Sequence, residues 1–360
     1  MSLLMVCVLI GCSSNNQSEN DPNTVINPET ENTGEDTNPS NGNSEFEVIA
    51  TNLSVPWEIE LMDEVIYISE RTGSITRIAD GNAVRKMVEL DQPLAEQAEA
   101  GLLGLAFSPD FDETSQAIAY YSYVDNGEVF QRIATIQEQD DRWVETGTLL
   151  DFIPGGQYHQ GGRIEIGPDD KLYVTTGDAT KPQLAQDKDS LAGKILRMNM
   201  DGTIPDDNPF PDSYVYSVGH RNPQGLAWDS QGNLYASEHG NQAHDEINLI
   251  EAGNNYGWPV IQGDEQADGM VSPIIHSGET TWAPSGLTFY DNNFYFASLR
   301  GEAIRKFNPE TETAEIVNDG YGRIRDVMAT ENGIYFITNN TDGRGSPSEP
   351  DDQLVFWRID

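Results

Sequence analysis

The sequence contains little cysteine and few basic residues. Among its 360 residues are two cysteines, and 20 Lys and Arg stand against 60 Asp and Glu, which gives a formal net charge of −40. Proteins that bind nucleic acid need basic patches, so this charge argues against such a partner. It is typical of a protein that faces water, salt or metal ions, and solubility is its simplest explanation. The length corresponds to one large domain or two ordinary ones, and it is ample to bury a hydrophobic core.

The apolar run at the N-terminus, Leu3 to Ile10, lacks the length to span a bilayer. It ends in LIGC, which resembles a bacterial lipobox. We therefore expect residues 1–12 to be a lipoprotein signal peptide with Cys12 as the lipidated residue. This predicts an extracytoplasmic protein, periplasmic or at the cell surface, that meets a bacterial membrane only through its lipid anchor. A buried first strand is the alternative interpretation of the apolar run. If the signal peptide is cleaved before Cys12, the mature chain keeps only this cysteine, and because lipid occupies it no disulfide is possible.

Residues 13–45 consist mainly of Ser, Asn, Glu, Asp, Thr and Pro, with almost no large apolar side chain. Such a segment cannot bury enough surface to offset the entropy cost of ordering it. We expect a disordered acidic linker here. The folded domain is predicted to cover residues 46–360.

Within this domain the sequence lacks any long helical stripe, and residues 91–100 (DQPLAEQAEA) predict a single short helix. Short tyrosine-centred strands recur instead, and an apolar strand generally precedes each of them across a turn such as PDD, DSQGN or ENG. Asn, Asp and Gly tolerate positive φ, so these turns favour hairpins. The central tyrosines, interpreted as core residues, are Tyr67, Tyr121, Tyr173, Tyr235, Tyr295 and Tyr335.

Six such hairpins over about 315 residues give roughly 50 residues per unit, which is the repeat length of propeller blades. The pattern therefore predicts an all-β protein, a six-bladed β-propeller. A pair of β-sandwiches is the alternative, but it explains the regular spacing less well. In a propeller, loops from successive blades converge on one mouth of the channel, so the site residues are sought in those loops.

His159, one of only five histidines, stands in QYHQGGRI just before a predicted hairpin. Gly161 and Gly162 beside it allow a sharp turn or the close approach of a ligand. Histidine is the side chain best suited to accept a proton near neutral pH, so His159 is a candidate base. A surface loop histidine is an equally good interpretation of this local pattern.

Arginines recur in the other loops. Arg221 and Asn222 stand in GHRNPQG and offer a charged donor fork and an amide, with a capped turn as the alternative. Arg300 follows a predicted strand in ASLRG, while Arg323 and Arg325 in YGRIRDV fall on one face of a strand. In so acidic a chain, clustered arginines predict an anionic ligand. Salt bridges to nearby acids are the alternative.

The segment 237–259, SEHGNQAHDEINLIEAGNNYGWP, combines carboxylates, Asn and flexible backbone. That composition suits a hard cation such as Ca²⁺, although no EF-hand spacing is present. His239 and His244 raise zinc as an alternative, without the Cys/His set that zinc requires. The residues alone thus predict a polyanionic ligand and a cation, and they name no reaction.

Several long motifs occur in the order typical of one family. They resemble those of the PQQ-dependent soluble sugar dehydrogenases, the glucose, aldose sugar and sorbosone dehydrogenase family, over roughly residues 46–360. The resemblance implies a six-bladed propeller that oxidises an aldose sugar at its anomeric carbon to the lactone, with PQQ and Ca²⁺ as cofactors. A quinone or a cytochrome would accept the electrons. The motifs include GLLGLAFSPDF (101–111), HQGGRIEIGPDDKLYVTTGD (159–178), VGHRNPQGLAW (218–228) and YGRIRDVMA (321–329).

The resemblance also implies roles for single residues. His159 matches the general base that takes the proton of the anomeric hydroxyl as hydride moves to PQQ, and Arg221 matches the residue that polarises the reacting quinone oxygen. Gly240 and Asn241 match two backbone carbonyls that bind the Ca²⁺ on PQQ. The remaining matches are cofactor contacts at Asn222, Arg300, Arg323, Arg325 and Glu99, and Glu246 and Tyr256, which match a second, structural Ca²⁺ site of some relatives.

The chain departs from the family at four positions. Glu99 stands where Gln is frequent, and it places a carboxylate beside a cofactor with three carboxylates. Arg300 stands where Lys is common, so we hypothesise that Glu99 and Arg300 pair. Tyr158 replaces a frequent Asp, which leaves the sugar preference open, and Asn241 replaces a usual Pro.

Two other functions are considered. The first is a Ca²⁺-dependent hydrolase resembling gluconolactonases, which would need a carboxylate-rich channel centre and no anion-binding arginines. The Arg323 and Arg325 pair argues against it. The second is a non-enzymatic, surface-tethered propeller that binds a sugar or another ligand.

Overall fold

The computed structural model describes residues 45–96 and 98–359, which form 24 strands, one α-helix and one 3-10 helix. The expected signal peptide with Cys12, and the expected linker apart from Glu45, lie outside the described residues. Within the described residues no helix is long and apolar enough to cross a membrane.

The largest sheet has eight strands and contains two antiparallel meanders, β2–β5 and β6–β9. A short parallel pairing of Met87–Glu89 in β5 with Arg142–Val144 in β9 joins them. The strands are β2 (Pro56–Met62), β3 (Val65–Glu70), β4 (Ser74–Ala79), β5 (Asn82–Glu89), β6 (Leu102–Phe107), β7 (Gln116–Asp125), β8 (Glu128–Glu138) and β9 (Arg142–Pro154).

The other strands form four antiparallel four-stranded sheets. Three of them are consecutive meanders: β10 (Gly161–Ile166), β11 (Lys171–Thr176), β12 (Lys194–Asn199) and β13 (Val215–Val218); β14 (Pro223–Trp228), β15 (Leu234–Glu238), β16 (Glu246–Ile250) and β17 (Ile275–His276); and β18 (Pro284–Tyr290), β19 (Asn293–Ser298), β20 (Ala303–Asn308) and β21 (Thr313–Asn318).

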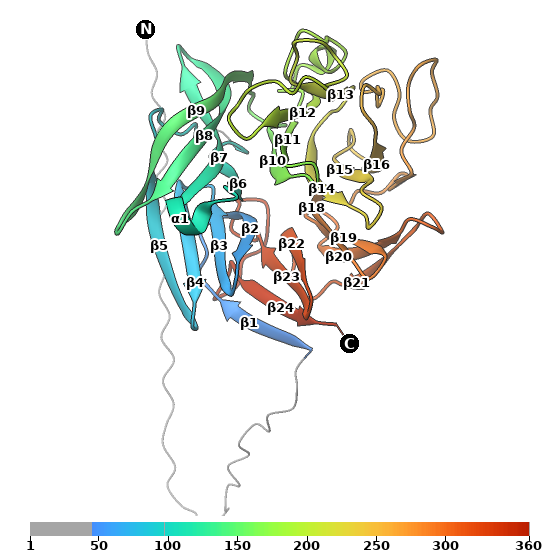
Figure 1. The fold of residues 1–360 in the computed structure, drawn as a ribbon. Helices are drawn as coiled ribbons and strands as arrows, with labels where there is room; N and C mark the ends of the chain where they lie inside the picture. The colour runs from blue at the N-terminus through green and yellow to red at the C-terminus, as the bar shows by residue number, and fades with distance from the viewer. Residues whose placement is uncertain (1–44, 97, 360) are drawn as a thin grey trace, which may run out of the picture. The chain divides into compact units, whose positions relative to one another are not determined.

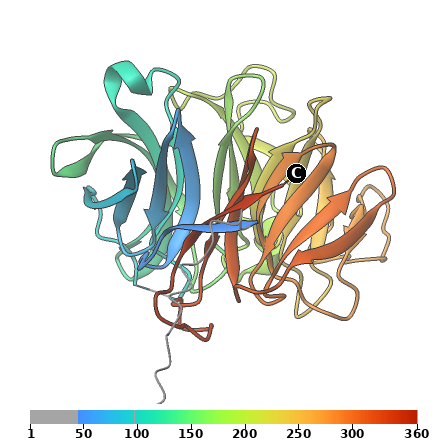
Figure 2. The same ribbon diagram turned by 90° about the horizontal axis from the view of Figure 1, so that it is seen from below.

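The last sheet joins the two ends of the described chain. β22 (Ile324–Thr330), β23 (Gly333–Thr338) and β24 (Leu354–Arg358) are followed in the sheet by β1 (Phe46–Ala50), which pairs antiparallel with β24. Figure 2 shows the blue strand β1 beside the red strands of the C-terminus. The N-terminal strand therefore fastens the last sheet from its outer edge.

The sheets surround a common centre, as Figure 1 shows. The innermost strand of each meander contacts the innermost strand of the next, and the last contacts the first. The strands in this closed ring are β2, β6, β10, β14, β18 and β22. The all-β prediction is confirmed, and the arrangement is that of a β-propeller.

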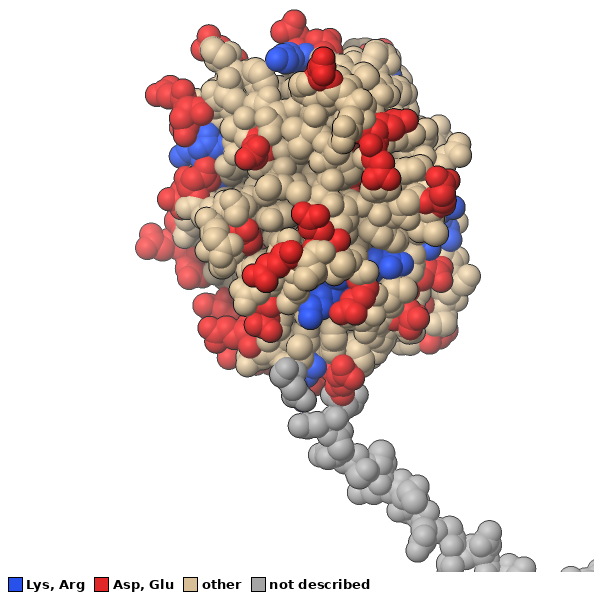
Figure 3. Space-filling view, turned by 90° about the vertical axis from the view of Figure 1, so that its right-hand side faces the viewer, with Lys and Arg blue, Asp and Glu red and all other residues tan. Residues whose placement is uncertain are grey.

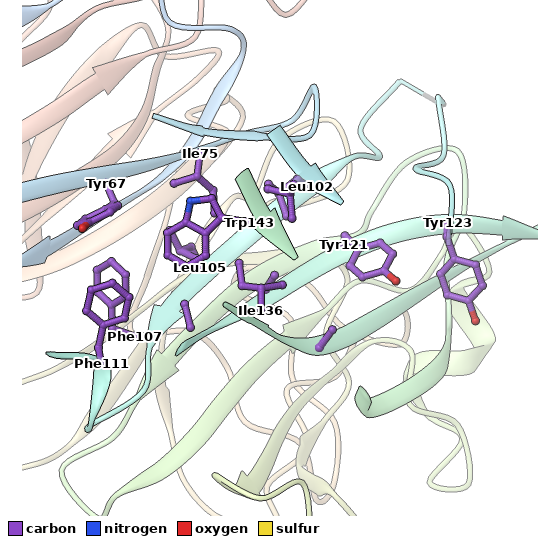
Figure 4. Close-up of a cluster of buried hydrophobic side chains, with 14 residues drawn as sticks. Tyr67, Ile75, Leu102, Leu105, Phe107, Phe111, Tyr121, Tyr123, Ile136 and Trp143 are labelled. Atoms are coloured by element: carbon purple, nitrogen blue, oxygen red, sulfur yellow. The ribbon is translucent and has the colours of Figure 1, made fainter. Parts of the chain in front are cut away.

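The second strand of each meander is buried on both faces, and this explains the recurring tyrosines, which lie on these strands. On β11, Leu172 and Val174 pack into the junction with the preceding sheet, whereas Tyr173 between them packs into the junction with the following sheet. Successive side chains of a strand point to opposite faces, so alternate residues fill alternate junctions. Figure 4 shows one of the six junction clusters, in which Tyr67 packs edge-on against Phe107 and Trp143.

The helix predicted for residues 91–100 is wrong. The described part of this segment is irregular, with one isolated bridge from Leu94 to Tyr123. A tertiary partner takes a backbone group that a helix would use, since the Ala95 N–H donates to the Ser122 carbonyl at 2.8 Å and not to the carbonyl of Asp91. The helices that form are α1 (Phe111–Thr114) and the 3-10 helix η1 (Pro182–Ala185).

Acidic side chains are spread across the surface. Figure 3 shows Asp and Glu scattered over one whole face, with few Lys and Arg among them. This distribution fits the solubility explanation of the net charge, because no single patch of that face collects it.

Candidate functional site

The topology of the sheets decides which loops meet. Consecutive strands of a meander alternate in direction, so loops from second to third strands lie at the same end as loops between meanders. Five of the residues predicted from the sequence lie in five different loops of this set. They are Glu99 in the β5–β6 loop, His159 in the β9–β10 loop, Arg221 in the β13–β14 loop, Gly240 in the β15–β16 loop and Arg300 in the β19–β20 loop.

These loops surround a pocket of about 200 Å³. Six residues predicted from the sequence line it, and seven others complete the wall. The predicted ones are Glu99, His159, Arg221, Asn222, Gly240 and Arg300, and the others are Tyr158, His239, Gln242, Asp245, Thr281, Ala283 and Arg344.

His159 is held at both its backbone and its ring. It has a φ of 62°, a left-handed conformation that costs a non-glycine residue about 1–2 kcal/mol. Its Nδ1 lies 2.7 Å from Oδ1 of Asp178, which is fully buried. Asp178 also accepts hydrogen bonds of 2.8 Å from Trp258 Nε1 and the Thr180 backbone. Because this carboxylate acts as an acceptor, Nδ1 carries the proton and Nε2 is left to receive one.

The glycines beside His159 form the sharp turn that was one of the two roles expected of them, with φ of 68° at Gly161 and 105° at Gly162. A Cβ on Gly161 would strike the Thr175 carbonyl, and a Cβ on Gly162 would lie 2.8 Å from the Trp57 ring. The φ of Gly162 is also one that L side chains rarely adopt. The pair therefore allows β10 to pack against β11 and Trp57.

Glu238, at the end of β15, holds the turn that carries Arg221. One carboxylate oxygen accepts the Arg221 backbone N–H, and the other lies 2.8 Å from Nδ1 of the buried His220. The turn is thus capped, as the alternative interpretation expected. The Arg221 guanidinium donates at 3.2 Å to the His239 carbonyl, and burial lowers the pKa of this arginine.

Arg323 and Arg325 lie at the start of β22, 4% and 3% exposed. Arg323 forms an ion pair of 2.8 Å with Asp342, whereas Arg325 forms no ion pair within the described residues. The Arg325 guanidinium lies 4.2 Å from the centre of the Trp57 ring. Burial, with the nearby charge of Arg71, lowers the pKa of Arg325 to about 9. The salt-bridge alternative therefore holds for Arg323 and not for Arg325.

Several buried donors have no hydrogen-bond partner among the described residues, two of them on residues that line the pocket, Arg221 and Asn222, and two on Arg323 and Arg325 outside its lining. Buried polar groups are normally paired, and an unpaired donor is costly. A ligand rich in acceptor oxygens would satisfy such a set, most strongly if it is anionic. The donors are Nε of Arg221, Nε of Arg323, Nε of Arg325 and Nδ2 of Asn222.

The hypothesis that Glu99 pairs with Arg300 is wrong. Glu99 Oε1 pairs with Arg344 Nη1 at 2.8 Å, and no ion pair among the described residues involves Arg300. Arg344 lies on the β23–β24 loop and reaches the Glu99 carboxylate across the pocket wall. Arg300 is exposed at the rim of the same pocket.

Gly240 and Asn241 lie on the β15–β16 loop. Asp245 fixes this loop by accepting the Gly240 N–H at 2.8 Å, and no hydrogen bond among the described residues ends on the carbonyl oxygen of either residue. Both carbonyls can therefore serve as ligands of a hard cation. In residues 45–96 and 98–359 no three His, Cys, Asp or Glu side chains form a metal-binding group, so zinc at His239 and His244 has no support.

Glu246 and Tyr256 lie outside the pocket lining. Glu246 begins β16 and accepts the Gly263 N–H at 3.0 Å, and burial raises its pKa to about 8. Tyr256 stacks on the His220 ring at 4.9 Å and donates to the Leu249 carbonyl at 2.6 Å. No hydrogen bond or ion pair in the described part of the chain joins Glu246 to Tyr256.

Carboxylates collect elsewhere in the ring, toward the other end of the inner strands. Glu60, Glu165 and Asp326 line a pocket of about 340 Å³ that shares no lining residue with the His159 pocket. Arg163 pairs with Asp326 at 3.0 Å and with Glu58 at 2.9 Å. Burial raises the pKa of Glu165 to about 8.

Several residues that shape the site were missed from the sequence. Asp178 ends the TTGD stretch, residues 175–178, and its position just after a predicted strand could have marked it as a loop residue near the site. Glu238, at the end of the next strand pattern, gave the same signal in SEHG. Arg344 and Trp57 carried no local signal, because only the ring of sheets brings them to this pocket.

Comparison with known proteins gives consistent results. A family model described as glucose/sorbosone dehydrogenase matches residues 53–346. Quinoprotein glucose dehydrogenase B of Acinetobacter calcoaceticus is 34% identical over 264 residues, which is 64% of this chain and 55% of that protein. Aldose sugar dehydrogenase of Escherichia coli strain K12 is 27% identical over 336 residues, 82% of this chain and 90% of that one.

A solved structure is similar over nearly its whole length. The PQQ-bound form of an aldose sugar dehydrogenase from Streptomyces coelicolor superimposes with a TM-score of 0.82 and 34% identity. The match covers 88% of this chain and 98% of that one. The chain thus spans little more than half of the Acinetobacter protein but almost all of the Streptomyces structure.

Proposed function

The chain belongs to the glucose/sorbosone dehydrogenase family, and we propose that it oxidises an aldose sugar at the anomeric carbon to the lactone with PQQ as cofactor. Its relatives are a quinoprotein glucose dehydrogenase and aldose sugar dehydrogenases, one of them PQQ-bound. We count the eight-stranded sheet as two blades, so that the fold is a six-bladed propeller. The closed ring of six inner strands supports this count.

One observation carries the proposal. Four buried donors have no hydrogen-bond partner among the described residues. Two are on Arg221 and Asn222, which line the pocket with His159, and two are on Arg323 and Arg325, which lie outside that lining. Arg323 is connected to the lining through Asp342 and the Arg344 backbone. PQQ has three carboxylates and an ortho-quinone, so it offers the acceptor oxygens that these donors lack. The residues therefore fit the cofactor, with Arg323 and Arg325 toward its carboxylates and Arg221 and Asn222 toward its quinone side. Arg300 at the rim adds a further positive charge.

His159 supplies the proton transfer. PQQ, when bound, would accept the hydride from the anomeric carbon. Nε2 of His159 takes the proton of the anomeric hydroxyl, because Nδ1 is committed to Asp178 at 2.7 Å. Asp178 fixes the ring orientation and stabilises the imidazolium that forms. The Arg221 guanidinium donates to the oxygen on which negative charge develops.

We also propose that Ca²⁺ binds through the carbonyl oxygens of Gly240 and Asn241. The absence of hydrogen bonds to these carbonyls within the described residues supports the proposal, and a cation there would act as a Lewis acid beside the cofactor. A second, structural Ca²⁺ at Glu246 and Tyr256 remains a proposal from the resemblance alone. For Tyr256 the ligand would be the backbone oxygen, since its hydroxyl is occupied by Leu249.

The proposal extends to the setting of the enzyme. A quinone or cytochrome would take the electrons, and the protein would act outside the cytoplasm, tethered by lipid on Cys12. The LIGC motif and the acidic segment that follows it support this location.

The proposed activity is tested by mixing the purified chain with PQQ and Ca²⁺ and screening aldoses with a redox dye. We expect dye reduction with at least one aldose, and stoichiometric lactone as product. His159→Ala should lower kcat by about 10²–10⁴. His244→Ala is the matched control, since His244 lies outside the pocket lining. PQQ binding without turnover of any aldose would favour a non-enzymatic binding propeller instead.

A further inference from the structure

One turn of the β23–β24 loop, residues 342–344, contacts both Arg323 and Glu99. Asp342 Oδ2 accepts a hydrogen bond of 2.8 Å from Arg323, and its Oδ1 accepts the Arg344 backbone N–H at 2.9 Å. Arg344 in turn binds the Glu99 carboxylate at 2.8 Å. Asp342 is 1% exposed at its side chain, so the carboxylate that anchors this turn is buried, although Arg344 itself is exposed.

Glu99 connects Arg344 to His159, the proposed base. Its Oε2 accepts the backbone N–H of His159 at 2.9 Å, while its Oε1 binds Arg344. The Glu99 side chain is 14% exposed and that of Arg344 41%, and the guanidinium lies over the Tyr158 ring at 5.5 Å. Burial opposes ionisation of Glu99, but the charge of Arg344 and the His159 N–H lower its pKa below 4.5.

The carboxylate of Glu99 therefore needs Arg344 for two reasons. Glu99 lines the pocket proposed to take a trianionic cofactor, where an uncompensated negative charge would repel it. Glu99 also anchors His159, whose left-handed backbone persists only where its surroundings fix it. Without its guanidinium partner, a largely buried carboxylate would move toward water and release the His159 N–H.

We propose that Arg344 is a positioning residue of this site: it neutralises Glu99, so that Glu99 holds the His159 backbone without repelling an anionic cofactor. Through Asp342 the same turn fixes Arg323. The part of the proposal that concerns the cofactor rests on the proposed function, whereas the part that concerns His159 does not.

The proposal is tested by a double-mutant cycle with Arg344→Gln, Glu99→Gln and the double variant. Arg344→Gln should weaken PQQ binding about tenfold, a change of about 1.4 kcal/mol. The double variant should bind within about threefold of the original chain, because Gln at position 99 is neutral and its amide oxygen still accepts the His159 N–H. Arg344→Lys, which keeps the charge, should also recover binding.

The matched control is Arg142→Gln. It removes an arginine that pairs with Glu89 at 3.2 Å on the surface, outside the pocket lining. It should therefore change neither the affinity for PQQ nor the coupling that the Tm measurements below report. The proposal is overturned if Arg344→Gln binds PQQ as the original chain does, or if the double variant binds as weakly as Arg344→Gln.

A second readout needs no cofactor. In the apo protein, Arg344→Gln should lower the Tm, and the double variant should recover part of that loss, which would show that the two side chains are coupled. Additive Tm changes would overturn the coupling. If the original chain does not bind PQQ, the proposed function fails, and the apo cycle still decides whether Arg344 holds Glu99.

Discussion

The hydrogen bond from His159 to Asp178 allows a sharp prediction for Asp178→Asn. The carboxylate accepts from Nδ1 of His159 at 2.7 Å and from Nε1 of Trp258 at 2.8 Å. An amide at position 178 has one acceptor oxygen and one NH₂ group. If the oxygen stays with Trp258, the NH₂ group faces Nδ1, and the proton of the imidazole must move to Nε2. If the oxygen stays with His159 and the Thr180 N–H, which donates to the same atom, Nδ1 keeps its acceptor but the imidazolium loses the negative charge that stabilises it. The proposed base is impaired in either orientation.

The expected loss follows from the bond that is removed. A hydrogen bond to a charged group is worth about 1.5–3 kcal/mol. At 1.36 kcal/mol per factor of ten, this corresponds to a fall in kcat of roughly tenfold to more than a hundredfold. The effect should appear in kcat with little change in KM, because Asp178 acts through His159 and does not line the pocket.

The assay is dye-linked aldose oxidation by the reconstituted enzyme. Asp169→Asn is the control, because Asp169 also binds an aromatic side chain and a basic one, Tyr173 at 3.0 Å and Arg197 at 2.8 Å, but lines another pocket. A wild-type kcat for Asp178→Asn, or a loss confined to KM, would refute the role assigned to the His159–Asp178 pair.

Two further predictions concern stability. Burial raises the pKa of Glu165 to about 8 from 4.5, so the stability that its neutral form contributes is full below pH 4.5 and is lost as the pH rises through 8. Glu165→Gln should therefore raise the Tm near pH 8 and change it little near pH 4, and an equal shift at both would contradict this. Gly162→Ala should lower the free energy of unfolding by about 1–3 kcal/mol in urea titrations, because the new Cβ meets Trp57 at 2.8 Å, and an unchanged midpoint would count against it.

The repeat was predictable from the sequence because it has a local cause. The second strand of each meander is buried on both faces, so its apolar pattern repeats with every unit, as Tyr173 and Tyr295 do on β11 and β19. The loops that carry His159 and Arg221 could be placed for the same reason, since hairpin order fixes the end at which a loop lies. The helix prediction for segment 91–100 failed because its backbone pairs with β7, through Ala95 N–H and the Ser122 carbonyl, and that strand leaves no trace in the segment itself.

Pairings between side chains were harder to predict from the sequence. Glu99 and Arg344 are separated by 245 positions, and only closure of the ring brings them together. Without that contact, Arg300 was the obvious candidate to compensate Glu99, since both were assigned to one site. Likewise, the pattern at Gly161 and Gly162 fitted either a sharp turn or the approach of a ligand, and only the fold shows that β11 and Trp57 pack against them. A pattern names the residue types of a site, and the fold decides which of them touch.

The most direct test of the proposed cofactor site is a PQQ titration of the purified chain, followed by absorbance, first with Ca²⁺ and then with excess chelator. We expect saturable binding that chelation weakens, because the donors of Arg221, Arg323 and Arg325 would bind PQQ while the Gly240 carbonyl would hold the Ca²⁺ beside it. Failure to bind PQQ in saturating Ca²⁺ would contradict the account.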